Sequence, residues 1–150
     1  MKTKAALVLL TLMVPLSAAW SHCQVPCGIY DDDMRLEMIA EHIKTIERSM
    51  QQIVELSEAE TPNMNQIVRW VNNKDAHADE LAHIATYYFL AQRVKPVAAT
   101  DQDYQTYIEM LKTLHQMVFY SMKAKQSTDM EYVAKLRELL KDFTKAYTGK

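Results

Sequence analysis

Apolar residues recur with the period of an α-helix along most of the chain, and this pattern constrains the fold more than any other feature. Between Met34 and Leu56 they follow steps of four, three, four and three residues, as Ile39, Ile43, Ile46, Met50 and Ile53. Side chains at this spacing lie on one face of a helix. The 150 residues include only two glycines and four prolines, so few positions interrupt a helix. We therefore predict a helical protein.

Three further segments carry the same pattern. The second helix should begin at Asn63 or Asn65, whose side chains can accept a hydrogen bond from the backbone. It should stop near Val94, because Pro96 cannot continue a helix. The pair Asn72-Asn73 is the point at which we expect this helix to bend.

The third helix is expected over residues 104–125 and the fourth over residues 128–147, with Gly149 ending it. Two residue pairs have the spacing of a capping box, Thr100 with Asp103 and Thr128 with Glu131. Amphipathic helices joined by short connections favour antiparallel neighbours. The predicted fold is therefore all-α, an up-down-up-down four-helix bundle over residues 31–150.

Composition excludes several classes of function. Two glycines cannot supply a phosphate-binding loop or a dinucleotide-binding motif. The net charge is −2, whereas a nucleic-acid-binding domain would favour a basic face. We expect no nucleic-acid partner.

Residues 1–21 resemble a cleavable signal peptide. Lys2 and Lys4 precede an apolar stretch over residues 5–14, and Pro15 then breaks the helical pattern. The apolar stretch is too short to span a bilayer. Ala19 and Ser21 are small residues at the positions that a signal peptidase reads. We predict cleavage after Ser21, export to the periplasm or the medium, and no membrane attachment of the mature protein.

Cleavage at this point would place both cysteines in the first residues of the mature chain, in a segment called here the hook, His22-Cys23-Gln24-Val25-Pro26-Cys27-Gly28-Ile29-Tyr30. The free amine of His22, the amide nitrogen of Cys23 and the thiolates of Cys23 and Cys27 would then lie in one compact loop, with the His22 imidazole beside them. Nitrogen and sulfur donors in this number suit Ni(II) or Cu(II). The hook is therefore a candidate metal site.

A disulfide is the competing interpretation of the same two residues. Cysteines of an exported protein usually pair, and a Cys23–Cys27 bond would leave a secreted helical binding module without catalysis. Zinc is disfavoured because a structural zinc site needs four side-chain ligands. Three intervening residues also exclude the Cys-x-x-Cys motif of thioredoxin-like proteins. From the spacing alone, both the metal site and the disulfide remain open.

Other histidines offer weaker candidates. Glu80-x-x-His83 matches half of a di-iron site in a helical bundle, but the chain has no second copy of this unit. His42, His77 and His115 are interpreted as separate structural or solvated residues.

The hook motif, His-Cys-x-x-Pro-Cys-Gly-x-Tyr at a processed amino terminus before four helices, resembles that of the nickel superoxide dismutases. The resemblance implies one nickel ion per chain, bound by the amine of His22, the amide nitrogen of Cys23 and the sulfur atoms of Cys23 and Cys27. The His22 imidazole would be an axial ligand of the oxidised metal. Superoxide would be converted to O₂ and H₂O₂ as nickel cycles between Ni(II) and Ni(III). The family also implies a maturation protease and a homohexamer.

The same resemblance implies roles around the metal. Tyr30 would stand over its open face, and Tyr88, in the pair Tyr88-Phe89, would line the entry. Glu37, which follows Arg35-Leu36, would support the axial imidazole. His77 takes the place of an arginine that some family members have on the second helix.

Overall fold

The computed structural model describes residues 31–149, and the predicted leader and hook lie outside this range. The described chain forms α2 (Asp32–Ser57), α3 (Met64–His83), η1 (Ile84–Arg93), α4 (Tyr104–Lys125) and α5 (Met130–Thr148). The segment η1 is a π-helix that continues α3 without a break. No strand occurs between residues 31 and 149.

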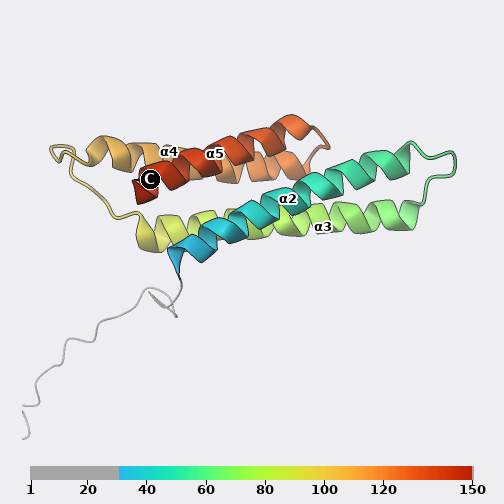
Figure 1. Cartoon of the computed structure of the whole chain (residues 1–150), viewed down its shortest axis with the longest axis horizontal. Coiled ribbons are helices and arrows are strands. Elements are labelled where there is room, and N and C mark those ends of the chain that lie inside the picture. Colours follow the sequence, from blue (N-terminus) through green and yellow to red (C-terminus); the bar gives the residue numbers. More distant parts are fainter. Residues whose placement is uncertain (1–30, 150) are drawn as a thin grey trace, which may run out of the picture.

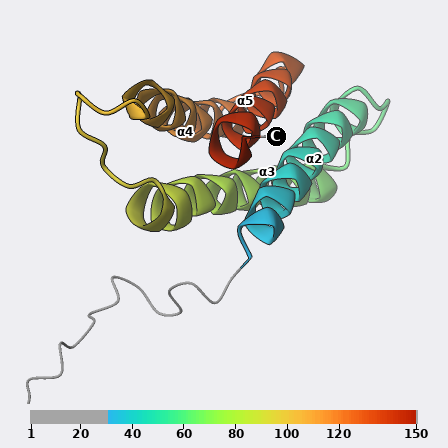
Figure 2. The ribbon, with the colours of Figure 1, turned by 60° about the vertical axis from the view of Figure 1, so that its left-hand side comes forward.

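The helices form two antiparallel hairpins, α2 with α3 and α4 with α5, which pack against each other (Figures 1 and 2). Helix α3 also contacts α4, and α2 also contacts α5, so each helix borders its neighbours in sequence and the ring closes. This arrangement confirms the predicted up-down-up-down four-helix bundle. The hairpins are offset along their length, and the α2–α3 turn extends beyond the α4–α5 turn (Figure 1).

The core contains the apolar stripes that the sequence predicts. Ile39, Ile43, Ile46, Met50 and Ile53 of α2 are all buried, as their helical spacing requires. At the end of the bundle where α2 begins, the rings of Phe89 and Phe143 pack edge to face with their centroids 4.8 Å apart. Burial of such side chains is the main source of stability in a bundle of this kind.

Helix ends agree with the sequence in some places and differ in others. The carboxylate of Asp31 accepts a hydrogen bond from the backbone N–H of Asp33, and Asn63 caps α3 through the N–H of Gln66. Gly149 ends α5 with a φ of 71°, a conformation that glycine adopts without strain. These three caps follow the predicted residue types.

Both predicted capping boxes are wrong. A turn closed by the N–H of Asp101 on the carbonyl of Ala98 encloses Thr100, so Thr100 cannot cap the helix that begins four residues later, at Tyr104. At α5 the cap is Asp129 rather than Thr128, and its carboxylate accepts from the N–H of Glu131 at 2.9 Å. An aspartate one residue nearer the helix reaches the free N–H groups first.

The predicted bend at Asn72-Asn73 is also wrong. Helix α3 continues through both residues, and the Asn73 side chain donates to the hydroxyl of Ser49 on α2 at 2.9 Å. The change in helix geometry comes at Ile84, where η1 begins. An asparagine in a helix thus serves here as a contact between helices.

One buried charge joins the two hairpins. Lys74 of α3 is 2 % exposed, and its ammonium donates to the carboxylate of Asp75 at 2.9 Å and to the backbone carbonyls of Ala124 and Lys125 at 2.8 and 2.5 Å. Those carbonyls belong to the last turn of α4, where the carbonyl groups have no N–H donor within the helix. Lys74 therefore caps α4 from a neighbouring helix.

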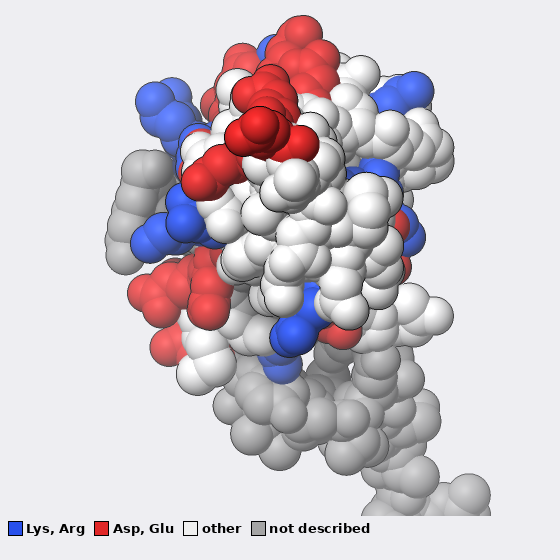
Figure 3. Space-filling model, turned by 90° about the vertical axis from the view of Figure 1, so that its right-hand side faces the viewer, with Lys and Arg blue, Asp and Glu red and all other residues white. Residues whose placement is uncertain are grey.

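The end of the bundle that carries the two hairpin turns shows a broad uncharged area bordered by acidic and basic residues (Figure 3). Three exposed apolar side chains near this end are Val54, Met64 and Val68. Among residues 31–149, no helix has the length and apolar character needed to cross a membrane.

Candidate functional site

The opposite end of the bundle is the one that the predicted metal site adjoins. The hook residues His22, Cys23, Cys27 and Tyr30 lie outside the described range, which begins at Asp31, directly after the hook. Helix α2 begins there, and the ends of η1 and α5 lie at the same end of the bundle (Figure 1). The described side chains at the end of the bundle where the hook joins α2 are therefore those of these three elements.

Asp32 is the centre of a cluster at this end. Its Oδ1 accepts hydrogen bonds from the hydroxyl of Tyr88 at 2.5 Å and from Nε of Arg93 at 2.7 Å. Its Oδ2 accepts from the hydroxyl of Tyr147 at 2.7 Å. One carboxylate in the first turn of α2 thus joins α2 to η1 and to α5.

Tyr88 is fixed on several sides. Its side chain is buried, with 7 % of the residue exposed, and its hydroxyl accepts from Nη2 of Arg93 at 3.1 Å. The guanidinium groups of Arg35 and Arg93 lie 5.1 and 5.2 Å from the centre of its ring, within the range of cation–π contacts. The ring of Phe89 meets it edge to face.

The cluster shifts the pKa values of its members in opposite directions. Burial alone would raise the pKa of Asp32, but the hydrogen bonds from Tyr88 and Tyr147 and the charge of Arg93 outweigh it and hold the pKa below its usual range. Burial and the nearby carboxylate raise the pKa of Tyr88, and they raise that of Tyr147 further. At neutral pH the cluster therefore contains an ionised Asp32 between two neutral phenols.

The π-helical geometry of η1 explains why Tyr88 and Arg93 reach the same carboxylate. Residues five apart point about 140° away from each other in an α-helix. A π-helix makes its hydrogen bonds between residues five apart, as between the N–H of Val94 and the carbonyl of Phe89 at 2.9 Å. Such residues then lie nearly one turn apart, on the same side of the helix.

The side chains of His42 and His77 contact each other, contrary to the sequence interpretation. Their Nδ1 atoms lie 2.8 Å apart, which joins α2 to α3. A hydrogen bond at this distance requires one ring to donate and the other to accept, so at least one ring is neutral. Burial and the charge of His77 lower the pKa of His42, against the opposing effect of Glu80 and Glu41.

The remaining predicted residues have simpler surroundings. Glu37 is exposed on α2 and makes no hydrogen bond or ion pair with another residue of the range 31–149. Its predicted support of an axial imidazole stays a prediction. His83 is exposed and stacks on Tyr87. Within the described range, no three side chains of His, Cys, Asp or Glu are arranged to hold a metal ion.

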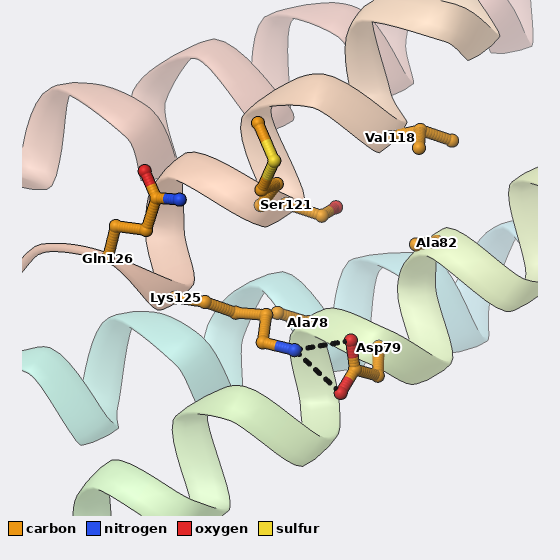
Figure 4. Close-up of a pocket in the computed structure, with 8 residues that line it drawn as sticks. Ala78, Asp79, Ala82, Val118, Ser121, Lys125 and Gln126 are labelled. Atoms are coloured by element: carbon orange, nitrogen blue, oxygen red, sulfur yellow. Dashed lines mark hydrogen bonds and ion pairs between the residues drawn. The ribbon is translucent and has the colours of Figure 1, made fainter.

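A groove of about 390 Å³ between α3 and α4 is a different kind of feature (Figure 4). Small and apolar side chains line it, among them Ala78, Ala82 and Ser121, and Lys125 spans it to form an ion pair with Asp79 at 2.7 Å. Its polar groups are already paired, since the Ser121 hydroxyl donates to the carbonyl of Met117 at 2.8 Å and Lys125 is held by Asp79, and this arrangement does not indicate a reaction.

Comparison with known protein families gives a match over residues 17–150, to the family described as nickel-containing superoxide dismutase. The chain belongs to this family. The match covers the hook as well as the four helices. No curated protein and no solved structure matches the chain.

The chain is therefore a superoxide dismutase, an oxidoreductase that acts on superoxide, and nickel is the metal of its family. The donor set of the hook fits this metal, because an amine, an amide and two thiolates suit a tetragonal nickel ion. The sequence of this superoxide dismutase contains two cysteines, and both lie within the hook. The hook is therefore the one segment that can supply thiolates to the metal.

Sequence reasoning about this superoxide dismutase identified Tyr88 but not Asp32, Arg93 or Tyr147 as its partners. One signal was available. Phe89 of η1 and Val94, the residue directly after η1, are buried apolar residues five apart, a step that an α-helix does not bring to one face. That step indicates the π-helix, and the π-helix brings Arg93 beside Tyr88.

Proposed function

We propose that the hook binds one nickel ion per chain and that superoxide is disproportionated there. The groups that would hold the nickel ion are the amine of His22, the amide nitrogen of Cys23 and the thiolates of Cys23 and Cys27, and the His22 imidazole would be a further donor. The observation that supports this proposal is the extent of the family match, which begins at residue 17 and so includes the whole hook.

Nickel held there would supply a Ni(III)/Ni(II) couple, the redox chemistry needed both to oxidise and to reduce superoxide. Two superoxide ions and two protons give one O₂ and one H₂O₂. His22 and the two cysteines would supply the donor atoms. Tyr30 and Tyr88 would limit access to the metal so that only small molecules reach it. Anionic sulfur and amide donors favour the higher oxidation state.

Maturation is part of the proposal, because the His22 amine exists only after cleavage of the bond between Ser21 and His22. A protease of the export route would release it, and the mature protein would act in the periplasm or the medium. The mature chains would assemble as a homohexamer. The features that support cleavage and export are the basic and apolar leader and the small residues Ala19 and Ser21.

The test compares the processed protein with cysteine variants. Cys23→Ser and Cys27→Ser should each abolish nickel binding and superoxide consumption while the helical circular dichroism signal stays unchanged. Gln24→Asp is the control within the hook, and it should retain both nickel and activity. Loss of helical signal in the cysteine variants would show instead that the cysteines serve folding.

Mass spectrometry of the mature chain separates the enzyme from the disulfide-bonded module. The enzyme requires a chain that starts at His22, with both thiols reduced and one nickel bound. One extra residue before His22 should prevent normal activity, because it replaces the amine with an amide. Full activity of that extended chain would contradict the proposed ligand set.

A further inference from the structure

The Tyr88 phenol has a complete set of hydrogen bonds within the described cluster. A phenol carries one proton to donate, and Tyr88 donates it to Oδ1 of Asp32 at 2.5 Å. Its oxygen accepts from Arg93 at 3.1 Å. The direction of the phenol O–H bond is therefore set by the carboxylate on one side and the guanidinium on the other.

Asp32 can impose this direction because of its charge. An ionised carboxylate only accepts hydrogen bonds, so both phenols that contact it must donate. Tyr147 does so at Oδ2, and Arg93 donates through Nε at Oδ1. Every side chain that hydrogen-bonds Asp32 in the described cluster is therefore a donor.

We propose that Asp32 is a positioning residue of the superoxide reaction, which with Arg93 and Tyr147 fixes the Tyr88 phenol in one orientation and withholds its proton from the substrate. The proposal rests on the proposed function, since the place of Tyr88 beside the metal follows from the family. Tyr88 then shapes the entry, and the two protons of the reaction come from elsewhere.

The diagnostic variant is Asp32→Asn, which keeps the shape of the side chain but adds an N–H donor. In the variant one acceptor oxygen becomes a donor, so at least one of the two phenols that donate to Asp32 must reverse its hydrogen bond. In the nickel-loaded enzyme we expect kcat/KM to fall on the order of tenfold, a modest loss for a misplaced group near a reacting centre. Nickel content should not change.

A double-mutant cycle tests whether Asp32 acts through Tyr88. In a Tyr88→Phe background, Asp32→Asn should change kcat/KM by less than about twofold, because coupled residues are not additive. An equal effect of Asp32→Asn in both backgrounds would overturn the proposal. Asp129→Asn is the matched control: it makes the same substitution at the start of α5, where asparagine caps equally well, and it should leave kcat/KM unchanged.

A measurement on the metal-free protein does not depend on the reaction. Alkaline titration of phenolate absorbance should show two tyrosines that ionise at lower pH in Asp32→Asn than in the wild type, because the carboxylate contributes to raising both pKa values. An unchanged titration curve would refute the positioning role even if the enzyme is active. An inactive wild type with the expected titration would instead refute the proposed function alone.

Discussion

Asp32 and Lys74 are two side chains of opposite charge, and each hydrogen-bonds groups on neighbouring helices. Each charged group makes three contacts and joins elements that are distant in sequence: Asp32 accepts from two phenols and a guanidinium, and Lys74 donates to a carboxylate and two backbone carbonyls. They differ in their partners. Those of Lys74 are mostly backbone, whereas those of Asp32 are all side chains.

The difference indicates which charge serves the fold and which serves the reaction. Backbone carbonyls at a helix end are fixed, so Lys74 has nothing to orient and its role is to satisfy them. The phenol and guanidinium groups around Asp32 can rotate, so Asp32 determines their orientation. We expect changes at Lys74 to lower stability most and to leave activity unchanged, and changes at Asp32 to lower both activity and stability.

The largest loss of stability should come from Lys74→Met. It leaves the carbonyls of Ala124 and Lys125 and the carboxylate of Asp75 without their common donor, which should cost about 3 kcal/mol of unfolding free energy. Chemical denaturation measures this loss, and nickel-normalised activity should stay unchanged. Lys112→Met, at a side chain 59 % exposed, is the control and should stay within about 0.5 kcal/mol of wild type.

A second prediction concerns pH. The pKa of Asp32 is held down in the folded protein, so its stabilisation is present above the pKa of an unfolded aspartate, about 4, and is lost as the pH falls through the folded value. Asp32→Asn should lower stability by about 1.5 kcal/mol at neutral pH and by much less in strong acid. Thermal unfolding at both pH values checks this, and a difference independent of pH would contradict it.

The His42–His77 contact should have a smaller effect. His42→Gln should cost about 1 kcal/mol at neutral pH, the net worth of one hydrogen bond. Because the pKa of His42 is lowered in the fold, the wild type should lose stability as the pH falls below about 6.5, where an unfolded histidine binds its proton. The variant should lose less over the same range in a thermal unfolding series, and equal acid sensitivity would exclude this cause.

The smallest effect should come from a charge pair on the surface. Arg137 of α5 donates through Nη1 and Nη2 to the two carboxylate oxygens of Glu47 of α2, but its side chain is half exposed. Arg137→Gln should cost about 0.5 kcal/mol, and added salt should reduce the difference. A cost as large as that of Lys74→Met would show that burial is not what separates these sites.

The sequence was sufficient to predict the four helices because their apolar spacing is regular. It was also sufficient to narrow the cap of α3 to Asn63 or Asn65, of which Asn63 caps the helix. It was not sufficient at Thr100 and Thr128, where a nearby aspartate competes for the same N–H groups. Local spacing does not resolve such competition.

The cluster around Asp32 was harder to predict because it depends on contacts across the fold. Asp32 and Tyr147 are 115 residues apart, and no spacing rule connects them. Arg93 reaches the same carboxylate only because η1 is π-helical. The hook, by contrast, is contiguous, so its donor set is readable from the sequence, although its ligation stays a prediction.

The bond from Tyr147 to Asp32 ties the last turn of α5 to the first turn of α2. Helix ends open readily, and their amide protons usually exchange with solvent early. Here the opening of one helix end is coupled to that of the other. Slow hydrogen exchange in the last turn of α5 would therefore report on the order of the first turn of α2, which directly follows the hook. A fusion partner attached after α5 would then disturb an enzyme whose chemistry lies at the other end of its sequence.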